Sequence, residues 1–340
     1  MRTVSRNAIA ADLEEIGQGG EAVVFRIRSQ PRRIFKEYRP KTLTSFDLAQ
    51  LISIIDFPSS LDPDERSWLL QRTTWPEEVV VASGNACGFV MSEIPDAFRR
   101  RHGLASNPRS VDCGWNYLAY RSEAHVAAML SEIPSPSDQQ IVELLLELAR
   151  TIELLHRHHI VLGDISGNNL LWSIEPTELL IIDCDSFRFE GTQGPSGHKE
   201  SPGWMDPYLR GGPTSGSSDV YKLGVAAFRS LWSDPRTAVT ADAVRSSMRP
   251  DVPRALHQLI EESVVDGTRP TASDWVRTLE DLYRYGGRPV LRAAPIPPVA
   301  PTPPRPILRS HLSPPNRPPI STHPKPPPPS SGPAPVGPTS

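Results

Sequence analysis

Short runs of alternating apolar and polar side chains, typical of β-strands, fill much of the first hundred residues. Residues 16–28 predict a strand, a tight turn and a second strand, and residues 32–38 predict a third short strand. Residues 78–94 predict a hairpin that turns around Ser83–Asn85. The pattern therefore favours a β-rich region near the N-terminal end of the chain.

Two helices are expected to interrupt these strands. A Thr or Ser at positions 44–45 is expected to cap the first one. Its apolar residues recur at helical spacing and share one face: Leu48, Leu51, Ile52 and Ile55. The second helix is predicted at Asp64–Arg72.

From about residue 137 the apolar residues follow a helical period. The strongest stripe lies in Ser137–His156 and consists of Ile141, Leu144, Leu145, Leu148, Ile152 and Leu155. Further helices are predicted at Ser218–Trp232, Pro253–Val265 and Ser273–Tyr283. Residues 96–136 show no clear period beyond an Arg-rich run at 99–101, and we expect a helix around Tyr117–Met129.

The last 55 residues of the 340-residue chain differ in composition from the rest. Residues 286–340 hold 20 of the 38 prolines and six Lys or Arg, with no Asp or Glu. Such a segment cannot bury enough apolar surface to offset its ordering entropy, so we expect a disordered, basic tail with polyproline II bias. It would serve as a solvated spacer or as a ligand for a Pro-motif-binding domain.

Charge and cysteine content indicate which partners and which cellular compartment to expect for this protein. The preceding 285 residues carry 30 basic and 39 acidic side chains, so nucleic acid is not a predicted partner. The three cysteines are far apart and form no C-x-x-C pair, which suits a reducing compartment. No apolar run approaches the roughly 18–20 residues that span a bilayer, and the N-terminus lacks a signal-peptide stretch. We therefore expect a soluble, cytoplasmic protein.

The polar residues with the clearest chemistry follow the strongest helix. Asp164 and Asn169 lie five residues apart in G-D-I-S-G-N-N-L-L, and Asp183 follows in L-L-I-I-D-C-D. Each lies beside an apolar run with strand character. Two carboxylates and an amide make a poor core, but they offer hard oxygen ligands for Mg²⁺ and an acceptor for a hydroxyl proton.

The order of these motifs resembles that of bacterial, eukaryotic-like Ser/Thr protein kinases over residues 12–284. The resemblance implies an α+β, bilobal fold. A β-rich N-lobe (12–95) would follow an N-terminal extension (1–11), and a larger helical C-lobe (96–285) would precede the tail. It also implies ATP and Mg²⁺, with Mn²⁺ as an alternative metal, and transfer of phosphate to Ser or Thr of protein substrates.

The resemblance assigns nucleotide-binding positions in the β-rich region. Gly17, Gly19 and Val24 match a Gly-rich phosphate loop, in which Ala22 replaces the third glycine. Lys36 matches the strand lysine that contacts the α- and β-phosphates, and it is one of only five lysines. The hinge that would hold adenine falls on Met91, Ser92 and Ile94.

The same resemblance assigns the catalytic positions. Asp164 would orient the substrate hydroxyl and accept its proton, while Asn169 and Asp183 would hold metal. Asp219, in S-D-V-Y-K-L-G, would brace the backbone around Asp164, and Arg269, in R-P-T-A, would be structural.

Several residues depart from the kinase pattern. Leu162 and Gly163 replace the usual His and Arg, so switching by phosphorylation of the activation loop is less expected. Ser166 replaces a lysine that would neutralise the γ-phosphate. In D-C-D, Cys184 and Asp185 replace the Phe and Gly of D-F-G.

Because of these departures, the sequence does not decide the acidic partners of two basic residues, Arg269 and Lys36. Tyr208 replaces a glutamate that would pair with Arg269, and Asp206 is a candidate for that role. Lys36 lacks an obvious carboxylate partner, because Asp47 and Glu65 both lie on predicted helices.

A narrower resemblance links W-P (75–76), G-D-I-S-G-N-N-L-L and I-D-C-D-S-F to a bacterial kinase branch often joined to helix-hairpin-helix DNA-binding domains. No such module follows here, so DNA binding is not carried over. Two other functions compete with a protein kinase. Ser166 and D-C-D would suit a nucleotide-binding pseudokinase scaffold, and the G-D-x-x-x-x-N loop without a lysine also resembles small-molecule phosphotransferases.

Overall fold

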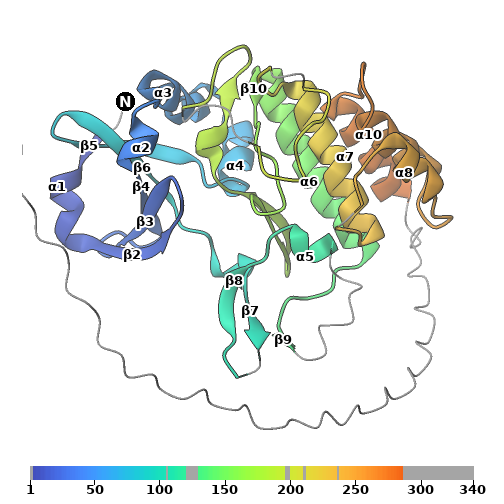
Figure 1. Cartoon of the computed structure of the whole chain (residues 1–340), viewed down its shortest axis with the longest axis horizontal. Helices are drawn as coiled ribbons and strands as arrows, with labels where there is room; N and C mark the ends of the chain where they lie inside the picture. Colours follow the sequence, from blue (N-terminus) through green and yellow to red (C-terminus); the bar gives the residue numbers. More distant parts are fainter. Residues whose placement is uncertain are drawn as a thin grey trace, which may run out of the picture. The chain divides into compact units, whose positions relative to one another are not determined.

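The computed structural model describes residues 3–104, 106–119, 129–195, 200–209, 212–235 and 237–285. The described chain is a mixed α+β structure (Figure 1). The predicted Pro-rich tail lies outside the described residues, as does most of the helix expected around Tyr117–Met129.

A six-stranded sheet forms the β-rich part, in the order β1-β5-β6-β4-β3-β2. Its strands are β1 (Thr3–Ser5), β2 (Leu13–Gln18), β3 (Ala22–Ile27), β4 (Arg33–Tyr38), β5 (Pro76–Ala82) and β6 (Asn85–Ser92). All neighbours are antiparallel except β1 and β5. The predicted strands and the turn at residues 83–84 are confirmed. β1 lies within the segment that the sequence set apart as an N-terminal extension.

A close backbone approach fixes β6 against β4. A Cβ atom on Gly88 would lie only 2.0 Å from the Lys36 carbonyl oxygen, so a side chain at this position would force the strands apart. Lys36 is paired with Phe89, the next residue of β6. The glycine therefore fixes the strand that carries Lys36.

Helix α3 (Leu48–Asp56) packs against the sheet and buries Leu51, Ile54 and Ile55. Its cap differs from the prediction, because the side chain of Asp47 accepts a hydrogen bond from the Gln50 amide at 3.1 Å. An aspartate at this position caps the helix as well as a Ser or Thr hydroxyl does, because its carboxylate accepts from the free amide three residues later. Its negative charge also interacts favourably with the positive end of the helix dipole. The remaining short helices here are α1 (Arg6–Ile9), α2 (Pro40–Leu43) and α4 (Pro63–Gln71).

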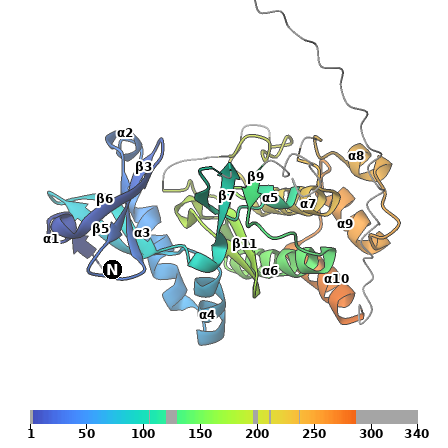
Figure 2. The same cartoon turned by 90° about the horizontal axis from the view of Figure 1, so that it is seen from below.

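The helical part surrounds α6 (Asp138–Arg157), which begins with a capping box between Ser137 and Gln140. Both views show α6 running beside α7 (Gly216–Trp232) and α10 (Ala272–Tyr285) (Figures 1 and 2). Smaller helices complete this part: α5 (Asn116–Ala119), α8 (Ala241–Ser246) and α9 (Arg254–Ser263). The long helices predicted from the apolar stripes are confirmed.

Residues 99–131 contain strands that the sequence did not predict. β7 (Arg99–Leu104) lies between β8 (Arg109–Asp112) and β9 (Met129–Ser131). Met129 is therefore in a strand, so the expected helix was wrong at that end. The sequence pattern did not predict this sheet, because its strands lack alternating apolar residues. Cross-strand ion pairs, such as Arg99 with Asp112 at 3.1 Å, stabilise it instead.

Two short sheets carry the loops that matter below. β10 (Ile160–Val161) pairs with β13 (Arg188–Phe189), and β11 (Leu170–Ile174) pairs with β12 (Thr177–Ile181). All four strands are antiparallel to their partners. They place the turns after residues 161 and 181 close to each other.

Asp206 is the partner of Arg269, as the sequence suggested. The guanidinium donates to both carboxylate oxygens at 2.5 and 2.9 Å, and both side chains are almost fully buried. Burial alone would raise the pKa of Asp206, but the hydrogen bonds from Arg269 and from the Tyr208 amide outweigh it and hold the pKa below its ordinary value.

Asp206→Asn is expected to lower the free energy of unfolding by about 3–5 kcal/mol at pH 7, because it leaves Arg269 buried without a counter-charge. A carboxyl group whose pKa is lower in the folded than in the unfolded protein stabilises the fold at pH values above its unfolded pKa of about 3.9. This contribution to stability is lost as the pH falls. Urea unfolding between pH 7 and pH 3 should therefore show the gap to wild type narrowing toward acid. The exposed Asp56→Asn serves as control; a gap that stays constant with pH would contradict the assignment.

Candidate functional site

Asp164, Asn169 and Asp183 lie together on two adjacent turns. The first turn, which we call the 162–169 loop, runs between β10 and β11, and Asp183 follows β12. The Asn169 carbonyl accepts from the Ile182 amide at 2.9 Å. The Asn169 side-chain amide donates to the Asp164 carbonyl at 2.8 Å and to its carboxylate at 3.1 Å. The structure therefore brings the three predicted residues together.

Lys36 reaches this site from the six-stranded sheet. Its Nζ lies 3.1 Å from Asp183 Oδ1 and 2.8 Å from Asp185 Oδ1. The other Asp185 oxygen accepts from the Tyr38 hydroxyl at 2.7 Å. Lys36, Tyr38 and the buried Asp185 thus form a hydrogen-bonded cluster that joins β4 to the turn after β12.

The carboxylate partners of Lys36 differ from both candidates that the sequence offered. Asp47 caps α3, and Glu65 pairs with Arg157 at 2.9 Å. Asp185 takes the place instead, from a position where the sequence had shown only the loss of a glycine. The carboxylate was visible in D-C-D, but a contact between residues 149 positions apart in the chain cannot be predicted from local pattern.

The charge states of the cluster follow from its surroundings. Burial alone would lower the pKa of Lys36, but the charges of Asp185 and Asp183 outweigh it and raise the pKa above its ordinary value. Burial, together with the nearby Asp185 carboxylate, raises the pKa of Tyr38. Lys36 is therefore a cation and Tyr38 a neutral donor across the physiological pH range.

The Gly-rich turn links β2 to β3 at the edge of the sheet. Gly17 pairs with Val24 across the hairpin, and the Gly19 amide donates to the Ala22 carbonyl at 2.8 Å. A Cβ atom on Gly17 would meet nothing within 4 Å, so the backbone at this position is open on its side-chain face. Val24 pairs with Lys36 on the next strand, which places the turn and the lysine on neighbouring strands.

The predicted hinge residues lie where β6 leaves the sheet. Met91 is buried and pairs with Ile34, whereas the exposed Ser92 donates to Glu77 at 2.9 Å. Ile94 packs against Leu171 and Leu180 of the β11–β12 hairpin. These residues therefore connect the sheet to the part of the chain that carries Asp164 and Asp183.

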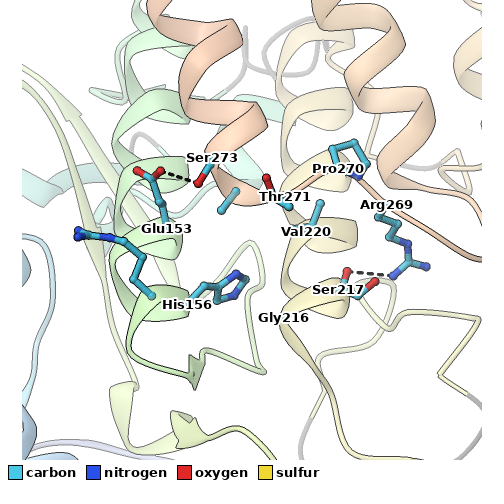
Figure 3. A pocket seen from close by; sticks show the side chains of 11 residues that line it. Glu153, His156, Gly216, Ser217, Val220, Arg269, Pro270, Thr271 and Ser273 are labelled. Carbon is cyan, nitrogen blue, oxygen red and sulfur yellow. Dashed lines mark hydrogen bonds between the residues drawn. The ribbon is translucent and has the colours of Figure 1, made fainter.

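Asp219 holds the backbone of the 162–169 loop in place. Its carboxylate is fully buried and accepts from the amides of Leu162 and Gly163 at 2.8 and 2.9 Å. It also lies 3.0 Å from His156 Nε2. His156 lines a cavity of about 380 Å³ among α6, α7 and the start of α10 (Figure 3).

Two buried cations occupy the space beside Gly163. Lys222 donates to the Gly163 carbonyl and pairs with Glu200 at 2.7 Å, although its side chain is fully buried. A Cβ atom on Gly163, whose φ is +78°, would lie 2.6 Å from an Arg188 nitrogen. The sequence missed both cations, although a lysine in the middle of the apolar helix α7 was a usable signal.

Ser201 is a further residue that the sequence did not assign to the site. Its amide and its hydroxyl both donate to Asp164 Oδ1 at 3.0 Å. The carboxylate at the centre of the site therefore already accepts a serine hydroxyl in this structure.

The donor set suits a hard divalent cation. Asp183 offers a carboxylate that is half exposed, and Asn169 beside it offers an amide oxygen. No group of three His, Cys, Asp or Glu side chains able to hold a metal occurs among the described residues. Mg²⁺ typically takes only one or two protein ligands, together with waters and substrate phosphates, so Asn169 and Asp183 fit it.

Comparison with known proteins finds two named kinases at low sequence identity. No family model matches the chain. The chain is 23% identical to protein kinase YegI of Escherichia coli O157:H7 over 322 aligned residues, which cover 79% of this chain and 44% of that protein. It is 22% identical to protein kinase YegI of Escherichia coli K12, over the same shares of both chains.

The chain thus spans less than half the length of these relatives. The similarity is weak, but it supports a kinase-like family, and the mixed α+β structure is consistent with a kinase-like fold. None of the helices in the described ranges is long and apolar enough to cross a membrane.

Gly163→Ala is expected to destabilise the protein more than Gly191→Ala does. Both glycines have φ near +79°, but nothing lies within 4 Å of a Cβ on Gly191. The control should therefore cost only about 1–2 kcal/mol for the left-handed conformation. The variant at 163 should cost about 1–3 kcal/mol more, because its methyl group displaces Arg188. Equal losses in urea unfolding would show that Arg188 does not need this space.

Proposed function

We propose that this protein is an ATP- and Mg²⁺-dependent protein kinase that transfers the γ-phosphoryl group to Ser or Thr hydroxyls. The observation that carries the proposal is the meeting of Lys36, from the sheet, with Asp183 beside the Asp164–Asn169 loop. Phosphoryl transfer needs chiefly such positioning and charge, and the kinase-named relatives support the same reaction class. A division into two lobes near residues 95–96 belongs to the proposal.

Asp164 is the proposed general base. The substrate hydroxyl oxygen attacks the γ-phosphorus, the bond from that phosphorus to the ADP oxygen breaks, and the hydroxyl proton passes to the Asp164 carboxylate. The contact with Ser201 supports this role, because it shows that the carboxylate accepts a hydroxyl hydrogen bond. Asn169 fixes the carboxylate through its side-chain amide.

The nucleotide would be held from the sheet side. The turn containing Gly17, Gly19, Ala22 and Val24 would face the phosphates, and the backbone at Met91, Ser92 and Ile94 would contact adenine. Mg²⁺, or Mn²⁺ in its place, would be held by Asn169 and Asp183 and would neutralise phosphate charge when bound.

Asp185 is proposed to hold Lys36 in place for the phosphates. Lys36 contacts two carboxylates, of which Asp183 is half exposed and Asp185 is buried. If Asp183 turns to the metal, Asp185 still anchors the ammonium, and Tyr38 fixes its second oxygen. In this protein the usual task of a helix carboxylate is thus assigned to the residue two positions after Asp183.

A nucleotide-binding scaffold without transfer is the second candidate. The observation that favours it is Ser166, which stands where a lysine would face the γ-phosphate and whose buried hydroxyl has no hydrogen-bond partner among the described residues. The small-molecule alternative has no comparable support from the relatives. The closer resemblance to the helix-hairpin-helix branch, the cytoplasmic location and docking through the Pro-rich tail stay predictions from the sequence.

Asp164→Asn is expected to lower the rate of phosphate incorporation by about 10²–10⁴-fold, because it removes the proton acceptor. Mass spectrometry of phosphosites after incubation with Mg²⁺–ATP, wild type beside the variant, measures this and identifies the modified residue types. Wild type that binds Mg²⁺–ATP but modifies neither itself nor a generic protein substrate would favour the scaffold. Equal modification by both proteins would refute the role of Asp164.

Asp185→Asn is expected to lower kcat/KM for ATP by about 10- to 100-fold, since one charge-assisted hydrogen bond contributes about 1.5–3 kcal/mol. Asp47→Asn and Glu65→Gln are matched controls, because these carboxylates face other partners. Both controls should retain wild-type kinetics. Loss of activity in Glu65→Gln, together with full activity in Asp185→Asn, would show that Glu65 of α4, and not Asp185, holds Lys36.

A further inference from the structure

The Gly-rich turn between β2 and β3 is held by residues that follow β4. Arg39 Nε donates to the Gly19 carbonyl at 2.9 Å, and Arg39 Nη2 donates to Gln18 Oε1 at 3.1 Å. The Glu21 carbonyl accepts from the Arg39 amide at 2.7 Å and from the Thr42 hydroxyl at 3.0 Å. The turn that the sequence assigned to phosphate binding is therefore fixed to the end of β4.

The two faces of β4 have different partners. Lys36 and Tyr38 contact Asp185 on one face. Glu37, which lies between them, accepts two hydrogen bonds from α1 on the other face, at 3.0 and 3.1 Å. Arg39 continues the chain with extended backbone angles (φ −69°, ψ 149°), so the alternation of a strand directs its side chain to the face of Glu37. Arg39 therefore holds the turn from the face opposite Lys36.

The bond to the Gly19 carbonyl orients the peptide group between Gly19 and Gly20. This peptide is trans, and in a trans peptide the carbonyl and the N–H point in opposite directions. The Gly20 N–H therefore points away from Arg39. Gly20 is exposed, and its amide has no hydrogen-bond partner among the described residues. The turn thus presents an unpaired donor on the side of Lys36.

The charge of Arg39 makes this donor stronger. Both side-chain acceptors of Arg39 are uncharged oxygens. A hydrogen bond from a charged donor is stronger than one between neutral groups, and it polarises the peptide that accepts it, so the Gly20 N–H becomes a better donor. Backbone N–H groups in tight turns are common binding sites for phosphate, and an anion gains most from a polarised N–H.

We propose that Arg39 is a positioning residue for the nucleotide phosphates, because it fixes the Gly19–Gly20 peptide with its N–H toward the phosphate chain of ATP. Arg39 acts through this peptide and does not contact the phosphates itself. The inference rests on the proposed function and adds a residue outside the motifs of the kinase pattern. Because Ser166 replaces the usual lysine, the turn and Lys36 provide a larger share of the phosphate contacts.

The test is calorimetric titration of the full chain with ATP and with adenosine, each in the presence of Mg²⁺. Arg39→Met keeps the aliphatic stem and removes the donors. We expect it to weaken ATP binding about tenfold, which corresponds to about 1.4 kcal/mol. The Kd for adenosine should stay at the wild-type value, since adenosine carries no phosphate. Wild-type affinity for ATP, or an equal loss for both ligands in a variant that thermal unfolding shows to be folded, would overturn the inference.

Arg28→Met is the matched control. Arg28 also donates from Nε and Nη2 to two uncharged oxygens, the carbonyls of Asp12 and Ala11 at 3.4 and 3.2 Å, but at the other end of the β2–β3 hairpin. This variant should retain the wild-type Kd for both ligands.

Arg39→Lys separates geometry from charge. Lysine keeps the positive charge but lacks the planar fork that bonds two acceptors at once, so it should restore only part of the affinity for ATP. Full affinity in Arg39→Lys would show that charge alone is sufficient and would contradict the positioning role. Gln18→Ala removes one acceptor and should weaken ATP binding about twofold in the wild-type background. It should have no further effect in Arg39→Met, because Gln18 acts through Arg39.

The binding measurement needs no phosphate transfer, so the inference and the proposed function can fail separately. A wild-type protein that binds ATP in this Arg39-dependent way but modifies no substrate would support the inference and refute the kinase. Phosphate transfer with an unchanged kcat/KM for ATP in Arg39→Met would overturn the inference and leave the kinase proposal standing.

Discussion

The structure depends on the ion pair between Lys36 and Asp185. The lysine lies on β4 of the six-stranded sheet, and the aspartate lies on the turn after β12, so the pair ties together two segments far apart in the chain. Removing both charges from water is costly and is repaid only when further hydrogen bonds satisfy the group. Tyr38 and Asp183 supply those bonds, which makes the position of the ammonium specific.

A second group of buried charged residues fixes the 162–169 loop, which carries Asp164 and Asn169. Asp219 accepts from the backbone amides of Leu162 and Gly163, and Lys222, three residues further along α7, donates to the carbonyl of Gly163. Arg188 fills the space that a side chain at 163 would need. Two departures from the kinase pattern thus have structural counterparts: the glycine at 163 leaves room for Arg188, and the aspartate at 185 supplies a carboxylate for Lys36.

Local pattern predicted the elements well where burial is one-sided. The strand that carries Lys36 and the long helix from Ser137 could be read from apolar spacing alone. The strand beginning at Arg99 could not, because charged pairs hold it. The residues of the site could be named from motifs, but the partner of Lys36 could not, since contact with Asp185 depends on the assembled fold and not on neighbours in the chain.

The most direct measurement of the central claim is a double-mutant cycle on the affinity for Mg²⁺–ATP. Calorimetric Kd values are compared for wild type, Lys36→Met, Asp185→Asn and the double variant, with thermal unfolding to confirm that each is folded. If Asp185 acts by holding Lys36 for the phosphates, each single variant weakens binding and the double variant binds no more weakly than Lys36→Met, which corresponds to a coupling of about 0.5–3 kcal/mol. Additive losses, or wild-type affinity in Asp185→Asn, would contradict it.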